Sequence, residues 1–333
     1  MPSPSDNAFA PAADPLAYRV APLHDPARDW PQTNCYVDLW IEALNARGLP
    51  PEAMLGFTAA MDFEGDQFTF FKPSLDDIEQ LYGLSTHELS IYDDLAGHIA
   101  EQCARGRLVM VEVDAFNLPD TRGVSYGVEH SKTTIGVNRI DPAIKRIDYF
   151  HNESYFRLEG ADYDALMAFG VSEGRAKLPP YAEIVKAHRA PLGLTAMRAS
   201  ARALLARHVG RRPADNPVEA FTARLPALLE RASTREPDFF HKLAFNSLRQ
   251  LGANFELMAS CLAWLAEGDE FSAEIEACRA ISAGAKSFQF LLARAIVRRK
   301  AVGLEPPLTT LAENYDRLFD GLTRRENALR LAS

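Results

Sequence analysis

The sequence predicts an α+β protein in two parts, a mixed half of helices and strands followed by a half made of helices alone. Residues 29 to about 190 combine apolar runs of strand length with amphipathic segments, whereas residues from about 191 onward show only long segments with helical periodicity. The 333 residues are 47% hydrophobic and 24% charged, which is ordinary for a globular protein of about two domains.

The composition divides the chain into three parts. Residues 1–28 are rich in Pro, Ala, Asp and Ser, and we expect them to form a mobile or extended N-terminal arm. Residues 29–190 are the expected α+β domain, which ends after the Pro179-Pro180 break. Residues 191–333 are the expected helical domain, a bundle or a cap over the first half.

The first helix of the α+β domain is expected to begin at the Thr33-Asn34-Cys35 step and to end at Gly48, because Thr33 or Asn34 can cap it and glycine commonly ends a helix. The other elements expected in this domain are a strand at 67–72, helices at about 75–81 and 91–105, and strands at 108–113, 132–140 and 146–150. In the helical domain, the periodicity predicts helices at about 193–208, 216–233, 238–266, 270–300 and 308–329.

Charge and motifs exclude several classes of function. The net charge of −9 argues against general affinity for nucleic acid or for anionic membranes. There is no GxxxxGK[ST], GxGxxG or HExxH motif, so nucleotide and zinc sites lack support and we expect no cofactor or metal bound by the chain itself.

The cysteines and the N-terminus indicate a compartment. Four cysteines without a CxxC pair favour a reducing environment over a disulfide framework. The N-terminus has no basic and apolar signal segment, and no run of 18 apolar residues follows it. We therefore expect a soluble, cytoplasmic protein.

Three residues form a candidate catalytic set. Cys35 lies at the expected start of a helix, where free backbone N–H groups and the helix dipole favour the thiolate, which is the nucleophilic form of a thiol. His130 precedes one strand and Asp148 lies in the next, so a short turn can place them side by side as base and orienter. The order Cys, His, Asp on these elements is typical of papain-like enzymes.

Each of these three residues, taken singly, also has a purely structural interpretation. A lone cysteine is most often a small core residue, and His130 or Asp148 can be an ordinary strand or turn residue. The other cysteines, Cys103, Cys261 and Cys278, fall late in a helix or on apolar helix faces, and we expect them in the core. The catalytic interpretation therefore depends on the three residues together.

Short motifs also carry a family resemblance. They are Thr33-Asn34-Cys35-Tyr36, residues 65–73 (GDQFTFFKP), 111–114 (VEVD), Leu118-Pro119, Glu129-His130, Asp148-Tyr149, 240–243 (FHKL) and 248–252 (LRQLG). With these motifs the chain resembles the DUF1839 family over most of its length. Residues 30 to about 160 more distantly resemble the N-terminal domain of butirosin-type acyltransferases.

The second resemblance implies a reaction. Those enzymes move an acyl group from a carrier-protein thioester to an amine through a papain-like cysteine. For this chain the resemblance implies Cys35 as acyl acceptor, His130 as base and Asp148 as orienter. The implied acyl donor is a carrier protein with a phosphopantetheine arm or a small-molecule thioester. The implied acceptor is a small-molecule amine. Papain-like peptidases place an oxyanion-hole Gln further before the Cys than Gln32 is here, so Asn34 or backbone N–H groups can take that role.

Further polar residues are candidates for substrate binding. Asp114 shares a strand face with Glu112 and can border a cleft, whereas Glu112 itself reads better as a solvated strand end. Asn246 and Arg249 lie roughly on one helix face, where packing between helices is the commoner role. Glu256, Lys286 and Gln289 are further polar residues on the expected helices. The basic clusters at 207–212 and 298–300 are either solvated helix ends or a docking patch for an acidic carrier protein.

Three functions remain open on the sequence alone. The first is acyl transfer from a carrier-protein thioester through Cys35 to an amine. The second is hydrolysis by the same triad, as a peptidase, amidase or thioesterase. The third is an inactive helical binding protein.

Overall fold

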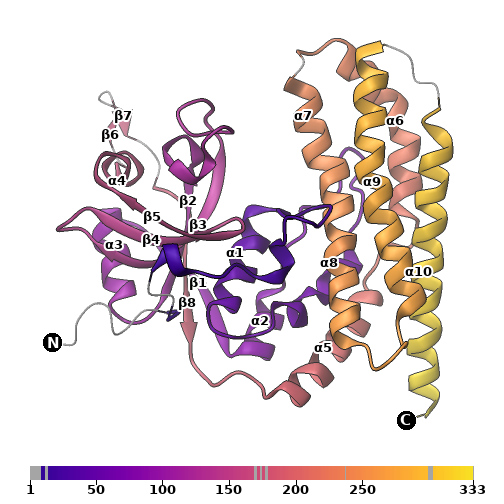
Figure 1. The fold of residues 1–333 in the computed structure, drawn as a ribbon, viewed down its shortest axis with the longest axis horizontal. Coiled ribbons are helices and arrows are strands. Elements are labelled where there is room, and N and C mark those ends of the chain that lie inside the picture. The colour runs from indigo at the N-terminus through magenta and orange to yellow at the C-terminus, as the bar shows by residue number, and fades with distance from the viewer. Residues whose placement is uncertain are drawn as a thin grey trace. The chain divides into compact units, whose positions relative to one another are not determined.

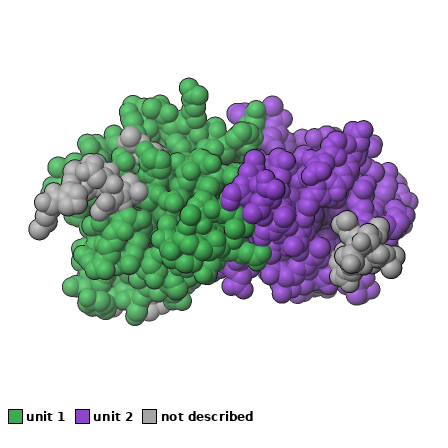
Figure 2. Space-filling view, turned by 90° about the horizontal axis from the view of Figure 1, so that it is seen from below, with its two compact units in different colours: residues 1–25, 34–51, 78–192 green, residues 26–33, 52–77, 193–333 purple. Residues whose placement is uncertain are grey.

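A computed structural model describes residues 9–11, 14–168, 171–172, 175–176, 179–236, 238–298 and 303–332. The chain forms two compact units, coloured separately in Figure 2. Unit 1 comprises residues 1–25, 34–51 and 78–192, and unit 2 comprises residues 26–33, 52–77 and 193–333. The α+β class is confirmed, since unit 1 holds the sheet and residues after 193 are helical (Figure 1).

Unit 1 is built on a six-stranded sheet in the order β1-β8-β2-β3-β4-β5, and every neighbouring pair is antiparallel. The strands expected at 108–113, 132–140 and 146–150 are confirmed as β2, β3 and β4. Strands β1, β5 and β8 were not predicted. The strands are β1 (Leu84–Glu88), β2 (Leu108–Asp114), β3 (Lys132–Asp141), β4 (Arg146–His151), β5 (Ser154–Glu159) and β8 (Ala182–Ala187), with a two-residue pair β6 (Val171–Ser172) and β7 (Arg175–Ala176) apart from the sheet.

The strand expected at 67–72 is wrong. This segment forms only an isolated bridge between Phe63 and Phe68. The aromatic rings of Phe63 and Phe68 pack on Phe221 instead, at centroid distances of 5.8 and 5.5 Å. Aromatic residues favour strands in general, but here packing against a helix satisfies them without a sheet partner.

Helices cover both faces of the sheet. On one face, α3 (Leu95–Cys103) and α4 (Gly160–Met167) form a core with alternate residues of the strands, including Val111, Ile135 and Tyr149. On the other face lies α1 (Cys35–Asn45). The side chain of Leu39 in α1 packs on Gly136, where an added Cβ would lie 3.2 Å from it. After α1 the chain forms the 3₁₀ run Pro51–Ala60, of which residues 52–60 belong to unit 2, and then α2 (Leu75–Tyr82), which begins in unit 2 and ends in unit 1.

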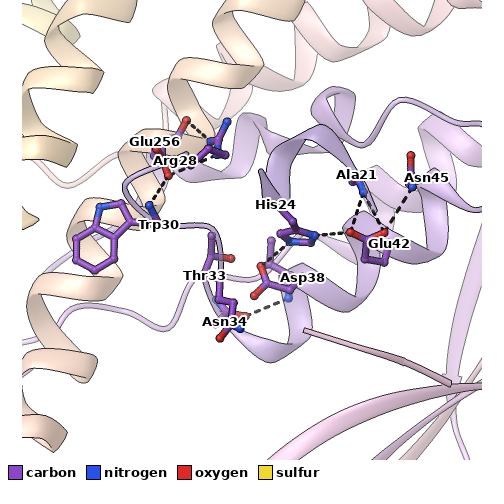
Figure 3. Close-up of polar contacts among 12 residues, drawn as sticks. Ala21, His24, Arg28, Trp30, Thr33, Asn34, Asp38, Glu42, Asn45 and Glu256 are labelled. Carbon is purple, nitrogen blue, oxygen red and sulfur yellow. Dashed lines mark hydrogen bonds and ion pairs between the residues drawn. The ribbon is translucent and has the colours of Figure 1, made fainter. Parts of the chain in front are cut away.

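The described part of the N-terminal arm packs on α1. Residues 14–25 form two 3₁₀ turns, Pro15–Ala17 and Pro22–His24. His24 is buried between two carboxylates of α1, with Nε2 3.3 Å from Asp38 and Nδ1 bonded to Glu42 (Figure 3). The backbone N–H of Ala21 also donates to Glu42. Buried ionic partners therefore hold residues 21–24 against α1.

Unit 2 is helical after residue 193, and all five expected helices are present. The stretch expected at 238–266 is a single run that contains a π-helical turn at Phe245–Arg249. Within the described ranges, no helix combines the length and the apolar character needed to cross a membrane. The helices are α5 (Leu194–Val209), α6 (Pro217–Ser233), α7 (Asp238–Ala244), α8 (Gln250–Leu265), α9 (Ser272–Arg298) and α10 (Glu305–Ala332).

Candidate active site

Cys35 is the first residue of α1, as predicted. The side chain of Asn34 caps this helix by accepting a hydrogen bond from the backbone N–H of Val37 at 3.0 Å. Of the four cysteines, Cys35 is partly exposed and the other three are buried. A thiol at a helix N-terminus meets backbone N–H groups and the positive end of the dipole, which favour a developing negative charge.

The sheet register shows which polar residues share a face with α1. Gly136, which faces Leu39 of α1, pairs with Met110 of β2. Because side chains alternate along a strand, Glu112 and Asp114 project on the same face as Met110. The start of α1 therefore lies on the sheet face that carries these two carboxylates.

A hydrogen-bonded set of three side chains leads from α1 to this sheet face. The hydroxyl of Tyr36, the residue after Cys35, donates to buried Glu183 of β8 at 3.1 Å. Tyr181 donates to the other oxygen of Glu183 at 2.6 Å. Burial, together with the charge of Glu183 and the hydrogen bonds to it, raises the pKa of both tyrosines, so both stay protonated as donors.

His130 is bonded to Asp114. Nδ1 of His130 lies 2.6 Å from Oδ2 of Asp114, and the His130 ring stacks on Phe116 at 4.3 Å. Burial raises the pKa of Asp114, but hydrogen bonds from His130 and from backbone N–H groups outweigh that effect and lower it. Asp114 therefore stays ionised and can orient the His130 ring.

The His130–Asp114 pair borders a cavity of about 430 Å³. Glu112, Lys132 and Tyr181 line it as well, and Lys132 forms an ion pair with Glu112 at 2.6 Å. The His130 side chain is 74% exposed. Among the described residues, no hydrogen bond or ion pair joins Cys35 to His130.

The structure does not bring Asp148 to His130, which corrects the expected orienter. A hairpin pairs residues that are equally distant from its turn, and Asp148 lies opposite Arg139. Arg139 is seven residues beyond Lys132 at the start of β3, or about 23 Å at roughly 3.3 Å per residue. Asp148 instead accepts two hydrogen bonds from Arg157, at 2.7 and 2.9 Å.

Neither side chain proposed for the oxyanion hole is shown in that role. The Asn34 side chain is used as the helix cap. The backbone carbonyl of Gln32 accepts a hydrogen bond from Arg249 at 2.8 Å, and that of Thr33 accepts another at 3.2 Å. Backbone N–H groups in the first turn of α1 are thus the donors best suited to an oxyanion.

The candidates in the helical half, Asn246 and Arg249, make their contacts within unit 2. Besides bonding the carbonyls of Gln32 and Thr33, Arg249 lies over the ring of Phe245 at 5.1 Å. Asn246 is exposed and donates to the carbonyl of Lys242, one turn earlier in its own helix. Arg249 therefore holds the chain just before Cys35, whereas Asn246 has a contact inside its own helix.

Segment 26–33 is held on α8 by further contacts. Glu256 accepts hydrogen bonds from the backbone N–H groups of Asp29 and Trp30, both at 3.0 Å (Figure 3). Lys286 of α9 donates to the carbonyl of Asp29 and lies 4.3 Å from the centre of the Trp30 ring. The contacts of Glu256 and Lys286 support the chain before Cys35.

Sequence reasoning missed a second histidine with an acidic partner. His151 at the end of β4 is buried, with Nδ1 2.5 Å from Asp120 and Nε2 2.7 Å from the hydroxyl of Thr133. Thr133 lies an odd number of residues from Gly136, so this set is on the sheet face away from α1. The hairpin rule could have found it, since the end of β4 returns to the start of β3.

Comparison with known protein families identifies the family of this chain. A model of the DUF1839 N-terminal domain matches residues 19–187, and a model of the DUF1839 C-terminal domain matches residues 195–324. The chain belongs to the DUF1839 family. No curated protein matches it. The comparisons give no support for the expected likeness to butirosin-type acyltransferases, and membership of DUF1839 itself names no reaction.

Proposed function

We propose that this DUF1839 protein is a thiol-dependent acyltransferase with Cys35 as nucleophile, His130 as general base and Asp114 as the residue that orients His130. One observation carries the proposal: the partly exposed Cys35 begins the helix that covers the sheet face bearing the His130–Asp114 pair. Catalytic hydrogen bonds are often loose without substrate and tighten in the complex, so the proposal expects Cys35 and His130 to meet when a substrate binds.

The reaction proceeds in two steps. His130 takes the proton of Cys35, the sulfur attacks the thioester carbonyl, and the carbon–sulfur bond of the donor breaks as the donor thiolate takes that proton. This exchange of one thioester for another yields acyl-Cys35. An amine then attacks the acyl carbon, His130 accepts its proton and returns it to the departing Cys35 sulfur, and an amide is released.

The cavity beside His130 suits an amine acceptor. Glu112 and Asp114 line it, and carboxylates attract a protonated amine. Lys132 donates to Glu112, which shows that this carboxylate can bind an ammonium group. A protein with four free cysteines works best in a reducing compartment, so we place this activity in the cytoplasm.

The test uses a small-molecule thioester with a panel of amines and reads the products by mass spectrometry. The proposal expects an amide that depends on Cys35 and is lost in Cys35→Ala. Formation of free acid alone, whatever amine is present, would identify a hydrolase with the same nucleophile. Equal amide formation by the wild type and Cys35→Ala would refute the proposal.

A further inference from the structure

Glu183 of β8 is a buried acid without a positively charged partner. It is 6% exposed and forms no ion pair with a residue that the structure describes. The other buried acids of the described ranges each pair with an Arg or a His, and they are Asp38, Glu42, Asp77, Asp148 and Glu274. The residue opposite Glu183 in β1 is Glu88, a second acid, and like charges in this position destabilise a sheet. Because burying a carboxylate also costs free energy, packing alone gives no reason for an acid at position 183.

The partners of Glu183 are two tyrosine hydroxyls, one on each carboxylate oxygen. Tyr36 donates to Oε2 at 3.1 Å, and Tyr181 donates to Oε1 at 2.6 Å. Tyr36 follows Cys35 in the first turn of α1, and Tyr181 lines the cavity beside His130. All of these residues lie in unit 1. Glu183 thus joins the residue next to the candidate nucleophile to the wall of the cavity that holds the candidate base.

We infer that Glu183 is a positioning residue for Cys35, an inference that rests on the proposed function. Glu183 holds Tyr36 and Tyr181 together, and it thereby fixes the start of α1 relative to the cavity beside His130. Hydrogen bonds to a carboxylate are stronger than those between neutral groups, so two of them hold this geometry firmly. Precise placement matters here because a displacement of about 1 Å at a reacting centre can lower a rate about 10²-fold.

The first part of the test removes one hydroxyl at each end of α1. Tyr36→Phe should lower the rate of Cys35 acylation by a saturating N-acetylcysteamine thioester about 10- to 100-fold and leave the half-saturating thioester concentration unchanged. Tyr18→Phe is the matched control, because Tyr18 donates to buried Glu42 of the same helix, about two turns beyond Cys35. This control should lower the Tm and leave the acylation rate unchanged.

The second part of the test changes the carboxylate itself. Gln keeps one acceptor oxygen and Leu keeps none, so Glu183→Gln should retain more of the acylation rate than Glu183→Leu. The losses should not add, because both changes break the same contact, and Glu183→Leu/Tyr36→Phe should acylate no more slowly than Glu183→Leu alone. Thermal melts show which variants fold, and Tyr36→Phe decides the matter if Glu183→Leu does not.

Each outcome decides for or against the positioning role. A slower acylation in Tyr36→Phe with no change in Tyr18→Phe supports it. Equal rates for the wild type and Tyr36→Phe, or rate losses that follow the loss of Tm in both tyrosine variants, would overturn it and leave the chemistry of Cys35 intact. A raised half-saturating concentration at an unchanged maximal rate would assign Glu183 to substrate binding and overturn positioning too. A wild type that forms no acyl-Cys35 would refute the proposed function and the positioning role with it.

Discussion

Asp114 and His130 are joined by a 2.6 Å hydrogen bond from the end of β2 to the residue that lies two positions before β3. The antiparallel register explains the contact, because Asp114 pairs with Lys132 and the strand ends therefore meet. A ring held by Asp114 at Nδ1 presents Nε2 for proton transfer. In the proposed mechanism this pair takes the base and orienter roles that the sequence analysis gave to His130 and Asp148.

The first prediction separates the two aspartates. Asp114→Asn should lower kcat about 10²- to 10⁴-fold, because an amide neither fixes the His130 tautomer nor stabilises the imidazolium. Asp148→Asn should leave kcat unchanged and lower the Tm, since it removes the charged partner of Arg157. Steady-state rates and thermal melts of both variants provide the check. The reverse pattern would restore Asp148 as the orienter.

The second prediction concerns pH and His24. Burial lowers the pKa of His24, but its hydrogen bonds to Asp38 and Glu42 outweigh burial and raise the pKa to about 9. A pKa raised from 6.5 means that the stabilisation is complete below about pH 6.5 and is lost as the pH rises through about 9. The stabilisation is about 3 kcal/mol, because the rise in pKa from 6.5 to about 9 is worth about 1.4 kcal/mol for each pH unit.

Thermal melts between pH 6 and 10 test this directly. The wild type should lose Tm over the alkaline part of this range, and His24→Gln should show a lower Tm with a weaker dependence on pH. His188→Gln is the control, because His188 pairs with Glu79 at an exposed position. Parallel pH profiles for the wild type and His24→Gln would mean that His24 is not the titrating group.

The third prediction concerns Gly252 of α8. A Cβ added there would lie 2.5 Å from three atoms of the Trp30 ring, so Gly252→Ala must displace the ring and should cost about 1–3 kcal/mol. At Gly210 an added Cβ would meet nothing closer than 3.5 Å, and Gly210→Ala should be neutral within about 0.5–1 kcal/mol. Calorimetric melts compare the two. An equally stable Gly252→Ala would show that Trp30 does not pack on α8.

The fourth prediction concerns thiol reactivity. Burial raises the pKa of Cys103 and of Cys261 to about 12 and also raises that of Cys278 well above its usual value, so these thiols stay protonated and shielded. Limiting iodoacetamide at neutral pH should therefore label Cys35 in the folded protein and the other three only after unfolding. Peptide mapping reads the sites. Comparable labelling of Cys261 in the folded protein would contradict the buried placement.

Much of the fold could be predicted because its signals are local. The start of α1 at Cys35 follows from Asn34 as a cap, and the five helices of the second half follow from their periodic apolar faces. Strands β2, β3 and β4 were predictable because each contains a run of residues typical of strands. The segment at 67–72 was not, since Phe68 packs on Phe221 and no sequence pattern reveals that distant partner.

The residues of the candidate site could be predicted only in part, because some of their contacts depend on how the strands pair. Cys35 and His130 were found from residue type and element, which are local properties. Their partners depend on register, and the choice of Asp148 ignored that a hairpin pairs residues by distance from its turn. Asp114 was noted as a cleft residue, but only the pairing of β2 with β3 shows that it reaches His130.

The account rests on Cys35 as an acyl acceptor assisted by His130, and intact-protein mass spectrometry after rapid quenching tests this most directly. With a thioester and no amine, the wild type should gain the mass of one acyl group, mapped to the peptide that contains Cys35. His130→Ala should acylate about 10²- to 10⁴-fold more slowly, and Cys35→Ala not at all. An unmodified wild-type protein, acylation at another residue, or equal rates for the wild type and His130→Ala would contradict the account.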